Sequence, residues 1–192
     1  MNDIVRLAVN RRRDCIRSAF LRSGRKSLLL TGSRGAGKTT LIDALTQGCD
    51  LPGVRSYARR EKPDGPPDCI FLENRRTGER RVIGRFLGGR MEPEAGVLDT
   101  FGVQALRDAM EGKNRWAVVD EIGFLENSSP AYCRALEELF RKKRVLAVLR
   151  KADSPLLCRL RSREDCLVID LDVLEDRQEH TGAGFPPEKG NL

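Results

Sequence analysis

The chain has 192 residues, of which 40% are hydrophobic and 33% charged, and its 35 basic and 28 acidic residues give a net charge of +7. A chain of this length typically folds as one domain around a substantial core. No stretch approaches the roughly 18 apolar residues of a membrane-spanning helix, and the N-terminus lacks the apolar core of a secretory signal, so we expect a cytoplasmic protein with no membrane partner.

Basic residues cluster at 11–13, 59–60, 75–81 and 141–144. Such a surface could attract nucleic acid. The clusters are dispersed, however, with few aromatic residues among them for base stacking, so an enzyme for anionic nucleotides is the favoured interpretation. The six cysteines form no CxxC pair and there is a single histidine, which argues against a structural zinc site.

The N-terminal half begins with a predicted amphipathic helix over residues 3–22, where apolar residues recur at spacings of three and four. Residues 27–31 are an apolar run typical of a buried parallel strand, and a helix then begins within residues 31–41 and continues to about Gly48. The region 52–96 instead combines turn signals with short β-rich segments, which predicts an antiparallel meander over about 54–88 with a hairpin loop at "RRTGE".

The C-terminal half alternates helices and strands. A helix is predicted from an N-cap at Asp99 or Thr100 to Gly112, and a second from the cap Ser129, with Pro130 in its first position. A short helix starts near Ser154 or Pro155. Apolar strands are predicted at 115–124, 145–149 and 166–171.

This alternation predicts an α/β fold in three layers, with a mostly parallel sheet, helices on both faces and ligands at the carboxyl ends of the strands. We expect an N-terminal amphipathic helical extension over 1–26, a main domain over 27–174 and a flexible tail over 175–192, because the tail is polar and rich in Gly and Pro.

A glycine-rich motif follows the first strand. It satisfies the pattern G-x-x-x-x-G-K-[ST] at every fixed position, which in P-loop proteins cradles phosphate with backbone N–H groups. Lys38 would reach the β- and γ-phosphates, and the Thr39 hydroxyl would ligate Mg²⁺. The predicted nucleotide-binding residues are Gly32, Ser33, Arg34, Gly35, Ala36, Gly37, Lys38, Thr39 and Thr40.

Acidic residues end the strand at 115–124. Asp120 is placed to hold Mg²⁺ together with Thr39. Glu121, directly after it, could orient and deprotonate a water that attacks the γ-phosphate, although Glu126 is an alternative for that role. Arg150, at the end of the strand 145–149, is a candidate for stabilising charge on the phosphate oxygens.

Weaker candidates lie in the meander. They would reach the nucleotide only if the meander folds over it, and they are Arg59, Arg60, Arg85 and Arg90.

The stretches "LLLTGSRGAGKTTL" and "VVDEIGFLE", with the C-terminal strand–helix–strand unit, resemble the small nucleoside-triphosphatase family first described from thermophiles, whose animal member is the cancer-related nucleoside-triphosphatase. The resemblance covers residues 27–172 and includes the meander sequence "RTGERRVIGRF". It implies a P-loop NTPase fold, Mg²⁺-dependent hydrolysis of ATP, GTP and other NTPs to NDP and phosphate, and the roles above for Lys38, Thr39, Asp120 and Glu121.

Two other functions stay open. A kinase could pass the γ-phosphate to a small molecule or a polynucleotide end, with the arginines of 75–90 as an acceptor clamp. A nucleotide-gated adaptor or nucleic-acid-associated protein could instead use the basic N-terminal helix for docking, although its apolar stripe favours a place in the core. The sequence does not determine the oligomeric state or the preferred base.

Overall fold

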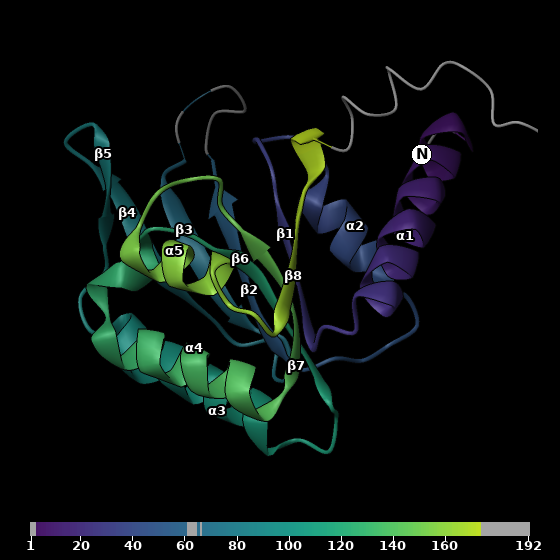
Figure 1. The fold of residues 1–192 in the computed structure, drawn as a ribbon. Coiled ribbons are helices and arrows are strands. Elements are labelled where there is room, and N and C mark those ends of the chain that lie inside the picture. Colours follow the sequence, from purple (N-terminus) through teal and green to yellow (C-terminus); the bar gives the residue numbers. More distant parts are fainter. Residues whose placement is uncertain (1–2, 61–64, 66, 174–192) are drawn as a thin grey trace, which may run out of the picture.

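The computed structural model describes residues 3–60, 65 and 67–173, and it forms one eight-stranded sheet between two layers of helices (Figure 1). The predicted tail over 175–192 lies outside the described residues. The described residues contain no candidate for a membrane-spanning helix. The elements are α1 (Asp3–Ser23), β1 (Ser27–Thr31), α2 (Lys38–Leu45), β2 (Gly53–Arg59), β3 (Cys69–Asn74), β4 (Arg80–Leu87), β5 (Arg90–Pro93), α3 (Val103–Glu111), β6 (Trp116–Ile122), α4 (Pro130–Lys142), β7 (Arg144–Leu149), α5 (Pro155–Arg161) and β8 (Cys166–Asp170).

The sheet has a parallel and an antiparallel half. Its strand order is β5-β4-β3-β2-β6-β7-β1-β8, and the strands from β2 to β8 in this order run parallel. From β2 outward, β3, β4 and β5 pair antiparallel. The predicted meander over 54–88 is therefore present, but its first strand belongs to both halves and a further strand, β5, extends it to Pro93.

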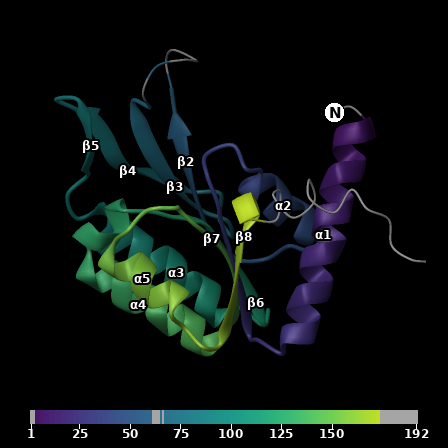
Figure 2. The same ribbon diagram turned by 45° about the horizontal axis from the view of Figure 1, so that its top comes forward.

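Alternating side chains along the strands build two cores. Leu28 and Leu30 of β1 pack against α1 and α2, whereas Leu29 points to the opposite core under α3, α4 and α5. This alternation follows from the two-residue period of a strand. Both views show the two helical layers on opposite faces of the sheet (Figures 1 and 2). The apolar strands that predicted a buried parallel sheet are covered on both sides.

Most predicted helix ends agree with the structure. Ser129 and Ser154 cap α4 and α5 by accepting hydrogen bonds from Tyr132 N–H and Leu157 N–H. The prediction for α3 was wrong at its start, since a π-helical turn (Leu98–Gly102) precedes it. Asp99 in that turn instead accepts a 2.5 Å hydrogen bond from the Ser129 hydroxyl. Helix α2 also ends at Leu45, three residues before Gly48.

The N-terminal helix α1 is part of the packed molecule. Its Ile16 and Phe20 are buried in the core between α2 and the sheet. The Phe20 ring meets Trp116 edge-on at 5.8 Å, and the Arg144 guanidinium lies 4.6 Å from the Trp116 ring centroid. Ile16 and Phe20 of the predicted apolar stripe therefore pack into the core.

Candidate nucleotide-binding site

The glycine-rich motif forms a loop between the end of β1 and the first turn of α2. Gly35 and Gly37 have φ values of +89° and +82°, which glycine adopts without strain. Gly37 is the N-cap of α2, and no side chain among the described residues caps the helix there. The first N–H groups of α2 and its positive dipole end therefore face the loop, as anion binding requires.

Lys38 lies folded over the loop. Its Nζ donates hydrogen bonds to the carbonyl oxygens of Gly32 at 2.9 Å and Ser33 at 2.8 Å. The charge of Lys38 is thereby held at the mouth of the loop, where it can meet phosphate oxygens.

Asp120 lies below the loop at the end of β6. Its Oδ1 accepts a hydrogen bond of 3.3 Å from the Thr39 hydroxyl, and its Oδ2 is 3.8 Å from Arg55 Nε. Only 2% of Asp120 is exposed. Burial raises its pKa to about 6, against the opposing effects of Arg55 and the Thr39 hydrogen bond. The structure thus brings together the two residues predicted to hold the metal.

Glu121 and Glu126 both line the cavity beside the glycine-rich loop but differ in their surroundings. Glu121 is partly exposed and lines the cavity above the loop. Glu126 is 3% exposed, and its Oε2 accepts a 2.9 Å hydrogen bond from Gly123 N–H. Burial raises the pKa of Glu126 to about 7. Glu126 therefore holds the turn after β6, while Glu121 faces the open space.

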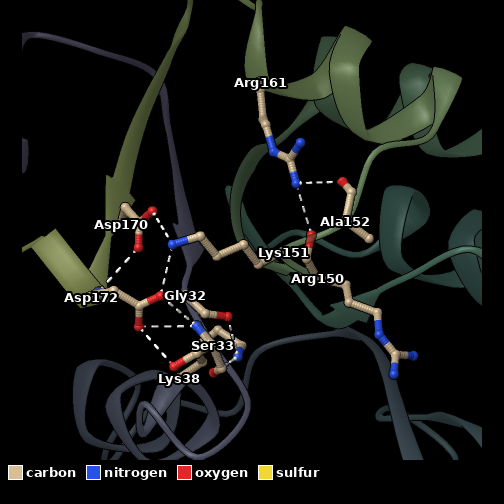
Figure 3. A network of polar contacts seen from close by, with 9 residues as sticks. All are labelled: Gly32, Ser33, Lys38, Arg150, Lys151, Ala152, Arg161, Asp170 and Asp172. Atoms are coloured by element: carbon tan, nitrogen blue, oxygen red, sulfur yellow. Dashed lines mark hydrogen bonds and ion pairs between the residues drawn. The ribbon is translucent and has the colours of Figure 1, made fainter.

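The segment after β7 presents two cations in opposite directions (Figure 3). Arg150 points toward Phe124, with its guanidinium carbon 5.3 Å from the ring centroid. Lys151 points toward β8 and the glycine-rich loop. Arg161 of α5 fixes the backbone between them, because its Nη2 donates to the carbonyl oxygens of Arg150 and Ala152 at 2.9 and 2.8 Å.

A network at the end of β8 reaches the tip of the loop (Figure 3). Asp172 accepts hydrogen bonds from Ser33 N–H at 2.9 and 3.0 Å and from the Ser33 hydroxyl at 2.9 Å. Lys151 Nζ lies 2.8 Å from Asp172 Oδ2 and 3.0 Å from Asp170 Oδ2. The Lys151 and Ser33 hydrogen bonds lower the pKa of Asp172 to about 2. Sequence analysis did not identify Asp170, Lys151 or Asp172, because their partners are distant in sequence.

These elements enclose a cavity of about 620 Å³. It is lined by most of the predicted loop residues together with Glu121, Glu126 and Arg150, and by Ser56, Ala58, Ile70 and Ile83 of the antiparallel half. Ala36 and Asp120 are not among the lining residues. Arg60 also lines the cavity, whereas Arg85 and Arg90 pair with Glu94 and Glu92.

Comparison with known proteins identifies relatives over this same region. The sequence model of the NTPase family matches residues 27–181. The nucleoside-triphosphatase THEP1 of Thermotoga petrophila is 30% identical over 152 residues, which cover 76% of this chain and 83% of the relative. The cancer-related nucleoside-triphosphatase homolog of Mus musculus is 28% identical over 139 residues, covering 64% of this chain and 73% of the relative.

Two solved structures share the fold. The crystal structure of THEP1 from Aquifex aeolicus has a TM-score of 0.61 at 20% identity and covers 82% of this chain and 99% of its own. The solution structure of a human cancer-related nucleoside triphosphatase has a TM-score of 0.58 at 22% identity, covering 81% and 97%. The predicted P-loop fold is confirmed, and the family match over residues 27–181 shows that this chain belongs to the nucleoside-triphosphatase family.

Proposed function

We propose that this nucleoside-triphosphatase releases the γ-phosphate of ATP, GTP and related nucleotides, with Mg²⁺ as cofactor and Glu121 as the residue that activates water. The observation that carries the proposal is the 3.3 Å contact between the Thr39 hydroxyl and Asp120 Oδ1. The contact joins the first turn of α2, directly after the glycine-rich loop, to β6 near its end. Glu121, the residue after Asp120, lines the cavity beside that loop.

The residues at this contact fit Mg²⁺. The hydroxyl of Thr39 and the carboxylate of Asp120 are the oxygen donors that Mg²⁺ prefers, and this ion is usually shared between one or two carboxylates and substrate phosphates. Among the residues that the structure describes, no cluster of three or more His, Cys, Asp or Glu could hold a metal. When bound, Mg²⁺ would neutralise charge on the phosphate oxygens.

The remaining steps fall to side chains of the chain itself. Lys38 would exchange its carbonyl partners for β- and γ-phosphate oxygens, where the charge-assisted bond is stronger. Glu121 would orient a water toward the γ-phosphate and accept its proton. Arg150, which also lines the cavity and whose backbone N–H donates to the Ile122 carbonyl oxygen at the end of β6, would stabilise the charge that develops on the γ-phosphate oxygens.

Glu121 is preferred over Glu126 as the base because of access. Glu126 is buried and its Oε2 is already bound to Gly123 N–H. Moving that carboxylate toward a water would leave the partly buried N–H group of Gly123 without its partner, which costs up to about 3 kcal/mol. Glu121 needs no such exchange.

Phosphate release from ATP, GTP, CTP and UTP, with Mg²⁺ and with EDTA, tests the proposal. Glu121→Gln should keep nucleotide affinity and lose about 100-fold or more in turnover. Lys38→Ala should lose both. Glu111→Gln, an exposed acid at the end of α3, is the matched control and should behave as the parent protein. Wild-type turnover by Glu121→Gln would exclude Glu121 as the base. Formation of NDP that requires an added acceptor, without release of free phosphate, would indicate a kinase instead.

A further inference from the structure

The cavity continues past the residues proposed to act on the γ-phosphate. From β1, which ends at the glycine-rich loop, the next strands in the sheet are β7, β6, β2, β3 and β4 in that order (Figure 1). Among the residues that line the cavity, Arg150 directly follows β7 and Glu121 lies in β6. Ser56, Ile70 and Ile83 lie in β2, β3 and β4. In the order of the sheet, Arg150 and Glu121 therefore stand between the loop and the antiparallel half.

The antiparallel end of the cavity has an apolar wall, which is formed by Ala58, Ile70, Ile83 and Leu125. Ile83 and Leu125 are buried in the core, and Ile70 packs against that core. The wall is therefore held in place by the packing of the fold. Phosphate groups and Mg²⁺ are bound by charged and polar groups, which these four side chains do not provide. The wall instead fits an apolar group.

The wall begins close to Glu121 in the sheet. Strands β2 and β6 pair in parallel with Arg55 opposite Asp120, so Ser56 and Glu121 are the next residues along the two paired strands. In the described part of the chain, the buried hydroxyl of Ser56 has no hydrogen-bond partner. A buried hydroxyl normally has such a partner, and a ligand that carries a hydroxyl group can supply it.

A second molecule fits this wall better than the nucleobase does. Lys38 would hold the phosphates at the loop, and Glu121 and Arg150 would act at the γ-phosphate, which is the end of the nucleotide remote from the base. A base at the wall would require the sugar to pass Arg150 and Glu121. A second molecule at the wall would instead reach the γ-phosphate from the side on which Glu121 activates water.

We propose that the apolar wall binds a small alcohol with an aliphatic or aromatic body, and that the protein transfers the γ-phosphate to its hydroxyl in competition with hydrolysis. The alcohol oxygen forms a bond to the γ-phosphorus while the bond from this phosphorus to the β,γ-bridging oxygen breaks, and Glu121 accepts the hydroxyl proton. The products are NDP and a phosphate monoester. The proposal rests on the proposed function and adds a second substrate to the same site.

Incubation with MgATP and primary alcohols of increasing chain length, from methanol to butanol, tests the proposal. Phosphorus NMR measures the ratio of alkyl phosphate to free phosphate at equal alcohol concentration, and this ratio does not depend on the overall turnover. For the parent protein the ratio should rise about fourfold with each added CH₂ group, because the wall buries that group. A ratio that stays flat or falls with chain length, or the absence of alkyl phosphate, would overturn the proposal.

Ile70→Thr should flatten this rise, because it keeps a β-branched residue in β3 and replaces part of the wall with a hydroxyl group. Val82→Thr is the matched control. Val82 is a partly buried residue of the neighbouring strand β4 and is not among the residues that line the cavity, so its ratios should match those of the parent protein. An equal change in both variants, or an unchanged rise in Ile70→Thr, would contradict the proposal.

Titration calorimetry distinguishes an alcohol site from a base site. If Ile70→Thr binds MgADP more weakly than the parent protein but binds inorganic tripolyphosphate equally well, the wall contacts the base and the proposal is overturned. Equal affinities of the two proteins for both ligands would support the separate alcohol site.

Two further outcomes separate this inference from the function on which it rests. If the parent protein releases no phosphate from MgATP without alcohol, the proposed hydrolysis fails. If it releases phosphate and forms no alkyl phosphate, only the second substrate fails. Should Ile70→Thr not fold, Ala58→Asn decides, because Ala58 is an exposed position of the same wall. A flattened rise in Ala58→Asn supports the proposal, and an unchanged rise overturns it.

Discussion

Thr39 and Asp120 are 81 residues apart in the sequence, and the Thr39 hydroxyl donates a 3.3 Å hydrogen bond to the Asp120 carboxylate. In the sheet, β7 separates β1 from β6. The contact therefore joins α2, the helix that follows β1, to a strand two positions from β1 in the sheet. Because Asp120 is almost fully buried, this pairing determines both the chemistry of the site and part of its stability.

Asp120→Asn should abolish the additional rise in unfolding temperature that Mg²⁺ gives when nucleotide is bound. In the parent protein, a ligand that binds only the folded state raises the unfolding temperature, and we expect a larger rise with MgADP than with ADP and EDTA. In Asp120→Asn the two rises should be equal. Asp43→Asn, a 54% exposed acid that also faces Arg55, is the control and should keep the difference. A Mg²⁺-dependent rise that persists in Asp120→Asn would place the metal elsewhere.

Glu126 should make the ligand-free protein less stable as the pH rises. Burial raises its pKa to about 7 from an ordinary value of 4.5, so between these values the unfolded chain releases the proton more readily than the folded one. The contribution is fully present below pH 4.5 and is lost by about pH 7, on the order of 3 kcal/mol in total. Urea unfolding at several pH values in this range should show a smaller decline in the free energy of unfolding for Glu126→Gln, whose amide oxygen can still accept from Gly123 N–H. The same decline with pH in both proteins would mean that the Glu126 carboxyl group is solvated.

The parts of the fold that sequence alone predicted are those governed by local pattern. The apolar runs of β1, β6 and β7, the caps Ser129 and Ser154 and the glycine-rich loop all follow from neighbouring residues. The double role of β2 was missed, because a strand's pairing direction depends on partners far along the chain. The π-helical turn before α3 was missed because Asp99 bonds to Ser129 and not to its own helix.

The residues of the site also divide into those that belong to local motifs and those whose partners lie far along the chain. Lys38, Thr39, Asp120 and Glu121 belong to short motifs and were recognised in the sequence. Asp172 contacts Ser33 across 139 residues. This pair has no fixed spacing that a pattern could detect.

Asp172→Ala should loosen the tip of the phosphate loop. The carboxylate of Asp172 holds the Ser33 N–H and hydroxyl and is itself held by Lys151. Without it, the Ser33 amide should exchange with solvent about tenfold faster or more, because exchange follows local opening. Hydrogen–deuterium exchange of peptides covering 32–37 measures this. Glu164→Ala, an exposed acid outside the network, should leave the rate unchanged. Equal rates in Asp172→Ala and the parent protein would show that the loop is held by its own backbone.

Gly53→Ala should separate the two halves of the sheet. Gly53 begins β2 with φ +146°, and a Cβ there would lie 1.8 Å from the carbonyl oxygen of Val118 in β6. Backbone, and not a flexible side chain, fills that space, so the strands must move apart. We expect a loss of at least about 4 kcal/mol in urea unfolding, or no folded protein.

The matched control for this substitution is Gly48→Ala, where φ is +77° and nothing lies within 4 Å of an added Cβ. It carries the strain of a left-handed backbone without the clash and should cost about 1 kcal/mol. The difference between the two variants isolates the close approach of β2 to β6. Because β2 also carries Arg55 toward Asp120, a Gly53→Ala protein that still folds should hydrolyse nucleotide more slowly. Equal losses in the free energy of unfolding of the two variants would show that β2 and β6 can move apart without cost. The antiparallel half would then be held to the site by α3 and the core beneath it.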